Sequence, residues 1–229
     1  MTKQTGFLLS YIKYGDYDAI LHCFTKENGF QSFFARGIYS AKNKKKAYLS
    51  AMNELALTLS AQSKYSSIPN ISHIEAVGHS EVYNDVKSTS VMFFAADFLH
   101  QILKNETKQE VLYTEIQKFI REVEHCNYQA HLFFLINLIK VQGLAPLLGE
   151  GQYLDPQSGN FTAIQTHHIF SKEISTIWKV LLAEEISYQP KISKEHQSVF
   201  LDSVLVYYHC HFPNFKTPQS LDILTQIFQ

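Results

Sequence analysis

Residues 7–59 constrain the fold more than any other stretch of this 229-residue chain. Short runs of aromatic and aliphatic residues, separated by the turn sequences KYGDYD and KENG, stand at 7–12, 19–25 and 30–36. Such runs, bounded by glycine, asparagine and aspartate, are typical of β-strands joined by hairpins. Leucines alternate through residues 54–60, which predicts a fourth strand, and residues 71–77 predict a fifth. Five short strands so close together indicate a small closed or partly open antiparallel barrel.

Beyond residue 80 the apolar residues recur with a helical period. Helices are predicted at 91–103, 107–125, 131–142, 171–187, 194–211 and 218–228. The helix at 131–142 is apolar almost all round, so we expect it to be the central buried helix, and Gly143 and Pro146 end it. The prediction is therefore an α+β protein, with a barrel domain at 1–79 and an all-helical domain at 80–229 that contains a loop at 149–166.

Charge is distributed unevenly along the chain. Residues 1–50 hold eight Lys and Arg against three acidic residues, a net of +5, whereas residues 78–229 hold eleven against sixteen, a net of −5. This asymmetry favours an anionic partner for the N-terminal part, although a solvated surface explains it equally well. No run of 18 apolar residues predicts a transmembrane helix. Three widely spaced cysteines and no signal peptide suit free thiols in a cytosolic protein.

The sequence offers no sign of an enzyme. It contains no phosphate-binding GxxxxGK[ST], no GxGxxG and no GxSxG, and its carboxylates are scattered. His167-His168 and His209-Cys210-His211 have spacings that splay the side chains apart on a helix, so we expect histidines at the surface or at helix ends rather than a metal site. We therefore predict no catalytic residues, no metal and no cofactor.

A basic segment after the third predicted strand is the strongest functional signal. Lysines can neutralise phosphates and tyrosines can stack on unpaired bases, a combination typical of single-strand binding surfaces. The alternative is that the lysines are solvated and the tyrosines pack on the barrel. The predicted DNA-binding residues, in a loop running from Gly37 to Lys46 and just before it, are Arg36, Tyr39, Lys42, Lys44, Lys45 and Lys46.

Several short motifs, in the expected order over most of the chain, together resemble the RecO family of bacterial DNA repair and recombination mediators. They are YGDYD at 14–18, FTKENGF at 24–30, ARGIYSAKNKKK at 35–46, LFFLINLIKVQGLAPLL at 132–148 and HFPNFKTPQSLDIL at 211–224. The resemblance implies an N-terminal five-stranded OB-fold barrel followed by a helical domain. It implies binding of single- and double-stranded DNA, strand annealing, and a cytoplasmic, nucleoid-associated location. It also implies partnership with RecR and with the C-terminal tail of single-stranded DNA-binding protein, in loading RecA.

One departure from the family pattern concerns metal. Many RecO members carry a four-cysteine zinc site after the GxxP stop, but residues 147–166 contain no cysteine. We therefore predict a zinc-less variant whose loop is held by ordinary packing of Tyr153, Leu154 and Phe161. For the partner's tail, the helices at 107–142 offer an apolar side chain and two cations, Phe119, Arg121 and Lys140.

Two readings of the function remain open. The first is a DNA-binding, strand-annealing mediator, whose binding must weaken with salt because neutralised phosphates release counterions. The alternative is a protein–protein interaction module, in which the barrel binds a partner subunit without touching DNA and the lysines only confer solubility. Convergence of the basic residues on one face of the barrel would favour the first reading, and scatter would favour the second.

Overall fold

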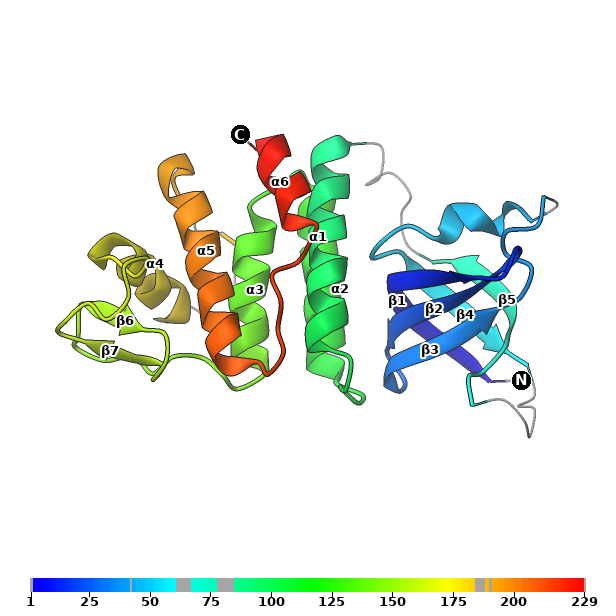
Figure 1. Cartoon of the computed structure of the whole chain (residues 1–229), viewed down its shortest axis with the longest axis horizontal. Coiled ribbons are helices and arrows are strands. Elements are labelled where there is room, and N and C mark those ends of the chain that lie inside the picture. The colour runs from blue at the N-terminus through cyan, green and yellow to red at the C-terminus, as the bar shows by residue number, and fades with distance from the viewer. Residues whose placement is uncertain are drawn as a thin grey trace. The chain divides into compact units, whose positions relative to one another are not determined.

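A computed structural model describes residues 2–41, 43–60, 67–77, 85–183, 188–189 and 191–228. The chain forms two compact units, which Figure 1 shows in one view. The first comprises residues 1–113 together with 218–229, and the second comprises residues 114–217. Each unit is therefore described by itself.

The first unit is built around five antiparallel strands in the order β3-β2-β1-β4-β5. They are β1 (Lys3–Tyr14), β2 (Asp18–Thr25), β3 (Gly29–Ala35), β4 (Glu54–Leu59) and β5 (Ile71–Ala76). The long strand β1 pairs with β2 from Gly6 to Tyr14 and with β4 from Lys3 to Phe7. A parallel bridge between Phe34 and Asn70 brings β3 against the segment that leads into β5. The predicted five-stranded OB-fold barrel is confirmed.

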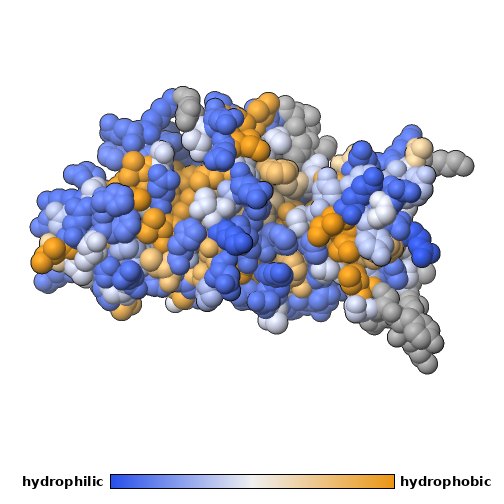
Figure 2. Space-filling view, viewed as in Figure 1, coloured by the Kyte–Doolittle hydropathy of each residue, from blue (hydrophilic) through white to orange (hydrophobic). Residues whose placement is uncertain are grey.

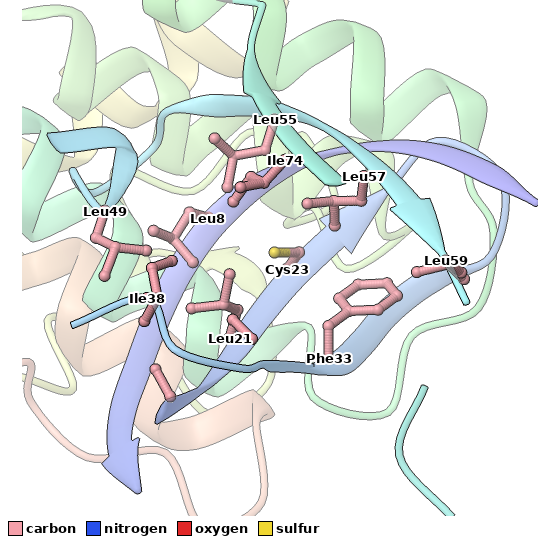
Figure 3. Close-up of a cluster of buried hydrophobic side chains, with 12 residues drawn as sticks. Leu8, Leu21, Cys23, Phe33, Ile38, Leu49, Leu55, Leu57, Leu59 and Ile74 are labelled. Carbon is pink, nitrogen blue, oxygen red and sulfur yellow. The ribbon is translucent and has the colours of Figure 1, made fainter. Parts of the chain in front are cut away.

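The barrel encloses an apolar core to which every strand contributes (Figure 3). Directly paired residues share a face, so the pairs Leu21–Phe33 and Ala19–Ala35 fix which side of β2 and β3 is internal. Leu21 and Phe33 have no exposed surface. The alternating leucines of β4 also point inward, as predicted from their spacing. Cys23 is a fully buried residue of this core and has a free thiol.

Helices pack on the barrel within the same unit. α1 (Val86–Ile102) lies against β1, and α6 (Leu221–Phe228), at the other end of the chain, packs on α1. Tyr113, in the first turn of α2 (Glu110–Glu124), stacks on Phe7 with ring centroids 4.7 Å apart. Its hydroxyl donates to Glu54 Oε1 at 2.7 Å. The part of the barrel's outer surface that carries Phe7 and Phe24 is therefore covered.

The second unit contains the rest of α2 and five further elements, two of which are strands that form a small hairpin. These are α3 (Ala130–Val141), β6 (Tyr153–Asp155), β7 (Asn160–Thr162), α4 (Lys172–Ala183) and α5 (Lys194–His211). α3 is buried along almost its whole length, as its apolar sequence predicts, and it packs against α4 and α5. Figure 1 shows the β6–β7 hairpin beside α4.

The predicted helices are all present, with ends that shift by a few residues. α5 coincides with its predicted range, while α1 begins five residues earlier than the predicted 91–103. The predicted domain boundary at residue 79 falls in residues 78–84, outside the described part of the chain, and stays a prediction. None of the described helices combines the length and the apolar character needed to cross a membrane.

Candidate nucleic-acid interface

The segment after β3 is anchored to the start of β2 by hydrogen bonds around Gly37. Gly37 has φ +64°, a conformation that glycine adopts without strain. Its N–H donates to Asp18 Oδ1 at 2.7 Å, and Asn43 Nδ2 donates to its carbonyl at 3.1 Å. The Asn43 side chain also accepts from the Lys45 N–H at 2.9 Å. These bonds fix the direction in which the basic segment leaves the barrel.

The sequence predicts one continuous loop over residues 37–46, but three of its lysines lie in a helical turn. A single 3-10 turn, η1 (Lys44–Tyr48), begins directly after Asn43, whose side chain caps it. The sequence signal for this turn is Asn43, a favoured N-cap residue, which a prediction based on charge alone does not use. Lys44 and Lys46 are exposed and Lys45 is half-buried. Lys42 lies outside the described residues.

Lys45 is tied to strand β5. Its Nζ lies 3.2 Å from His73 Nδ1, and His73 Nε2 lies 2.9 Å from Glu75 Oε1. An ammonium group can only donate, so the neutral His73 ring carries its proton on Nε2 and donates it to Glu75. That hydrogen bond holds the pKa of Glu75 below its usual value. Lys45 therefore fastens η1 to the barrel, and Lys44 and Lys46 present their charge to solvent.

A cluster of two tyrosines and two lysines stands at one open end of the barrel. We call it the mouth cluster, and it consists of Tyr11, Lys13, Tyr39 and Lys46. The Nζ atoms of Lys13 and Lys46 lie 5.8 and 5.5 Å from the centroid of the Tyr39 ring, within cation–π distance. Burial and the neighbouring Tyr11 hydroxyl raise the pKa of Tyr39. In the described part of the chain, neither lysine forms an ion pair with a carboxylate.

The mouth cluster lies on the inward-facing side of the strands, beyond the core. In the register of β1 and β2, Tyr11 pairs with Leu21 and Lys13 pairs with Ala19, and both partners belong to the barrel core. Tyr39 also packs on the edge of that core. Because β1 extends past the filled part of the barrel, Tyr11 and Lys13 reach solvent. Two ammonium groups beside an accessible aromatic ring can hold phosphate and stack a base.

A second group of apolar residues lies on the opposite, outward side of the same strands. We call it the outer strip, and it consists of Ile12, Tyr14, Ile20 and Phe34. Ile12 pairs with Ile20, and Ile20 with Phe34, so the three side chains form a row across β1, β2 and β3. Tyr14 meets Phe34 edge to face, with ring centroids 5.7 Å apart. Figure 2 shows hydrophobic surface over these three strands.

Several of the predicted DNA-binding residues lie in or near the mouth cluster. Tyr39 and Lys46 belong to the mouth cluster, and Lys44 is exposed one turn away. Arg36 is exposed in the turn that directly follows β3.

Sequence reasoning overlooked the residues of β1. Tyr11, Lys13 and Tyr14 were included only in the run that predicts the first strand and its turn. The pairing register shifts between Leu8 and Ser10, and the strand continues to Tyr14, two residues beyond the predicted end at Ile12. The available signal was the sequence YIKYGDY at residues 11–17. The end of a filled barrel cannot bury all of its tyrosines, so some of them are expected at the surface.

The three residues predicted for partner binding do not form a pocket. Phe119 is fully buried and stacks on Phe134 at 4.2 Å between ring centroids, so it offers no surface to a peptide. Lys140 Nζ donates to the Leu181 carbonyl at 2.5 Å. Only Arg121 is exposed. Helical periodicity marks Phe119 as apolar but does not distinguish a core residue from the floor of a groove.

The histidines have ordinary hydrogen-bond partners. His209 Nε2 lies 3.1 Å from Thr217 Oγ1, and His211 Nε2 lies 2.9 Å from the Pro156 carbonyl. His167 and His168 stack on each other. Within the residues that the structure describes, no three His, Cys, Asp or Glu side chains are grouped so that they could hold a metal ion.

The segment at 149–166 is held by contacts within the second unit. Leu154 is fully buried, and its N–H donates to Ser175 Oγ at 3.0 Å. Lys179 Nζ donates to the Gly149 carbonyl at 2.8 Å and lies 4.8 Å from the centroid of the Phe161 ring. Tyr153 is half-buried in β6. Helix α4 therefore provides both a hydroxyl and a cation that fasten this hairpin.

Comparisons with known proteins agree with this architecture. Residues 1–78 match the family described as "Recombination protein O N terminal". The DNA repair protein RecO of Flavobacterium johnsoniae is 27% identical over 234 residues, covering 99% of this chain and 98% of that protein. RecO of Phocaeicola vulgatus is 24% identical, covering 100% and 99%. RecO of Porphyromonas gingivalis is 25% identical, covering 94% of each chain.

The similarity extends through both compact units, and the N-terminal match coincides with the barrel strands. The motifs that resemble RecO in sequence lie between the β1–β2 turn and α6. Over nearly its whole length the chain is similar to DNA repair proteins named RecO, and its barrel matches the N-terminal domain of that family.

Proposed function

We propose that this protein is a non-enzymatic recombination mediator that binds single-stranded DNA through the mouth cluster and the lysines of η1. The observation that carries the proposal is the placement of the Lys13 and Lys46 ammonium groups 5.8 and 5.5 Å from the Tyr39 ring centroid, at the end of an OB-fold barrel. Ammonium groups neutralise phosphates, and a neighbouring aromatic ring can stack on a base of any identity. This combination suits a strand of arbitrary sequence.

The electrostatics of the site support binding without sequence preference. Lys44 adds a third exposed cation beside Lys46, while the tie from Lys45 to His73 keeps η1 in place. A strand held mainly through its phosphates is held regardless of sequence, which a mediator requires. Double-stranded DNA can use the same cations, but it cannot stack a base on Tyr39 without unpairing.

Similarity to RecO proteins along nearly the whole chain supports further proposals about partners. We infer that the protein promotes annealing and acts with RecR and the tail of single-stranded DNA-binding protein in loading RecA. Its place of action is then the nucleoid in the cytoplasm. The structure supplies no pocket for that tail from Phe119 and Lys140, since one is buried and the other is bonded to a carbonyl. Arg121 alone remains as an exposed cation for an acidic peptide.

The test is fluorescence anisotropy of a labelled oligothymidylate titrated with the protein at low salt. The variant K13A/K44A/K46A removes three exposed charges from the barrel. A matched control, K172A/K191A/K194A, removes three exposed charges from the second unit. We expect the barrel variant to lose at least about 10-fold in affinity and the control to lose little, because only the first removes phosphate contacts.

Two other outcomes would count against the proposal. Equal losses in both variants would indicate a diffuse electrostatic attraction rather than a site on the barrel. If the folded wild-type protein does not bind the oligonucleotide at low salt, the barrel becomes a protein-interaction module instead. Capture of purified RecR would then be compared between wild type and K13A/K44A/K46A. Capture by wild type that is lost in the variant would identify this surface as a RecR-binding site.

A further inference from the structure

The barrel and α1 meet through a stack of three rings that the proposed function does not use. His22 of β2, Phe30 of β3 and His100 of α1 stack on one another, with ring centroids 5.3 to 5.9 Å apart. The planes of the two imidazole rings lie at 23° to each other. All three residues are half-buried. The stack is therefore part of the contact between α1 and the outer face of the barrel.

Two serines flank His22 on the same face of the sheet. Ser10 of β1 and Ser32 of β3 are its direct partners in the neighbouring strands. The His22 Nδ1 atom lies 2.8 Å from Ser32 Oγ, and this hydrogen bond fixes the orientation of the ring. The Ser10 Oγ atom is buried and has no hydrogen-bond partner among the described residues. The neighbouring strands therefore place only hydroxyl groups, and no carboxylate, directly beside His22.

The surroundings of the two histidines disfavour positive charge. Burial lowers the pKa of both His22 and His100. His100 and then Lys104, which follows α1, lower the pKa of His22 further. Lys104 also lowers the pKa of His100, by more than Asp97 raises it. The folded protein therefore holds both rings in the neutral form.

The carboxylates of the elements that meet here already accept hydrogen bonds. They are Asp97 of α1, which accepts from Ser220, Glu27 of the β2–β3 turn, which accepts from Thr5, and Glu106 of the α1–α2 connection, which accepts from Gln109. The nearby acidic side chains are thus engaged elsewhere, and a second imidazolium charge in the stack would not be balanced.

We propose that the His22–His100 stack is a pH-sensitive latch between the barrel and α1. While both rings are neutral, they stack and the contact is closed. At lower pH the rings gain protons, and two imidazolium groups then face each other beside the Lys104 ammonium group. Like charges in a partly buried contact repel, so the end of α1 and the connection that follows it separate from β2 and β3. Opening exposes the outward-facing rings of His22 and Phe30.

The pH range of the latch follows from the ordinary histidine pKa of 6.5. A histidine whose pKa is lowered in the closed state contributes fully to closure above pH 6.5, and this contribution is lost as pH falls through the lowered value. His131 of α3 is a buried histidine with a pKa of about 4, so it stays mainly neutral at pH 5.5. It therefore does not contribute to a change between pH 7.5 and pH 5.5.

The Phe30 amide reports directly on the latch. Its N–H donates to the Glu106 carbonyl at 3.0 Å, a hydrogen bond that joins β3 to the α1–α2 connection. Hydrogen exchange of this amide, followed by NMR and corrected for the intrinsic rate at each pH, measures how often the contact opens. The Leu8 amide, which donates to the Asn53 carbonyl at 2.9 Å within the barrel, is the internal control.

Two variants separate the charge of the stack from its rings. H22F/H100F keeps two aromatic rings that cannot be protonated, and H100K introduces a permanent positive charge. The matched controls H167F/H168F and H168K make the same changes in the His167–His168 stack of the second unit, whose ring centroids are 4.7 Å apart.

We expect the wild-type Phe30 amide to lose between about 5-fold and 100-fold in protection from pH 7.5 to pH 5.5, since each histidine protonated only in the open state favours opening by up to about 10-fold. The Leu8 amide should change little. H22F/H100F should lose less than about twofold, because neither ring titrates. H100K should show at pH 7.5 the low protection that wild type shows at pH 5.5. Both control variants should behave as wild type.

Several outcomes would overturn the latch. One is unchanged protection of Phe30 in wild type at the two pH values, and another is an equal loss at Phe30 and Leu8, which would indicate global unfolding. An equal loss in H22F/H100F would assign the acid sensitivity to other groups. Normal protection of H100K at pH 7.5 would show that the contact tolerates a charge. If H100K unfolds altogether, the comparison of wild type with H22F/H100F decides the question.

Discussion

At the scale of single residues, Gly29 shows how one position fixes the contact between the barrel and the α1–α2 connection. It occupies the β2–β3 turn with φ +74°, and an added Cβ would lie 2.4 Å from the Glu106 carbonyl oxygen. The neighbouring Phe30 N–H donates to that same carbonyl at 3.0 Å. The sequence Asn-Gly predicts the turn. Only the structure shows that the turn also needs a residue without a side chain, because the main chain of Glu106 and Thr107 lies directly against it.

We therefore expect Gly29→Ala to destabilise the protein by more than about 2 kcal/mol, because left-handed backbone strain adds to a clash with main-chain atoms. Gly15→Ala is the control, because Gly15 has φ +59° but no atom within 4 Å of the added Cβ. It should cost about 1 kcal/mol from backbone strain alone. Urea unfolding of both variants measures the difference. Equal losses would show that the approach of Gly29 to Glu106 does not matter.

Tyr113 joins α2 to the barrel through a ring and a hydroxyl. Its ring stacks on Phe7, and its hydroxyl donates to Glu54 Oε1 at 2.7 Å. Tyr113→Phe should cost about 1–2 kcal/mol, because one hydrogen bond to a carboxylate is lost. Tyr113→Ala should cost about 3–5 kcal/mol, because the ring also leaves a cavity. Calorimetric unfolding distinguishes them, and equal effects would mean that the ring contributes nothing.

His131 gives the protein a pH dependence. It is fully enclosed in α3, its Nδ1 bonds the Tyr128 carbonyl, and burial lowers its pKa to about 4. The folded state therefore holds the neutral ring. Its contribution to stability is complete above the ordinary histidine pKa of 6.5 and is lost as pH falls toward 4.

Unfolding free energies measured by urea between pH 7 and pH 4 should therefore decrease by up to about 3 kcal/mol from this residue. A His131→Gln variant retains a side-chain donor but does not titrate. It should be less stable at pH 7 and should show a shallower decrease with falling pH. An unchanged slope would assign the acid sensitivity to other groups.

At the scale of elements, strands and helices were largely predictable because their signals are local. The leucine alternation of β4 and the Asn-Gly turn before β3 each appear within a few residues. Features that depend on distant contacts were not. Lys45 of η1 contacts His73 of β5, and α6 returns to α1, where Asp97 accepts from the Ser220 hydroxyl. Neither contact can be read from hydrophobic periodicity.

The candidate site could be predicted only in part, because some of its signals are local and others depend on strand register. Lys46 and Tyr39 were found because clustered lysines stand out in any reading of charge. Lys13 and Tyr14 were missed because their side depends on the register of β1, which shifts between Leu8 and Ser10. A shift of one residue exchanges the two faces of a strand, so spacing alone could not separate the mouth cluster from the outer strip.

The β6–β7 hairpin yields a prediction at this scale. Ser175 is fully buried, and its hydroxyl accepts from the Leu154 N–H and donates to the Phe170 carbonyl. Ser175→Ala should cost about 1–3 kcal/mol, because the Leu154 N–H loses its partner in the interior. Treatment with a chelator should leave the melting temperature of wild type unchanged. A large decrease on chelation would show that a metal holds this segment.

At the scale of the whole molecule, the two ends of the chain meet in one compact unit. α6, at residues 221–228, packs on α1, which packs on the barrel. The charge asymmetry of the sequence coincides with this organisation, since the net positive residues 1–50 contain the mouth cluster and the lysines of η1. The charge difference therefore favours an anionic partner that binds to the barrel.

The most direct test of this account is the dependence of single-strand affinity on salt. Each phosphate contact on a single strand contributes about −0.7 to the slope of log K against log salt concentration. If Lys13, Lys44 and Lys46 each hold a phosphate, K13A/K44A/K46A should have a slope about 2 units shallower than wild type. The control K172A/K191A/K194A should keep the wild-type slope. An unchanged slope in the barrel variant would contradict the assignment of the DNA site to the mouth of the barrel.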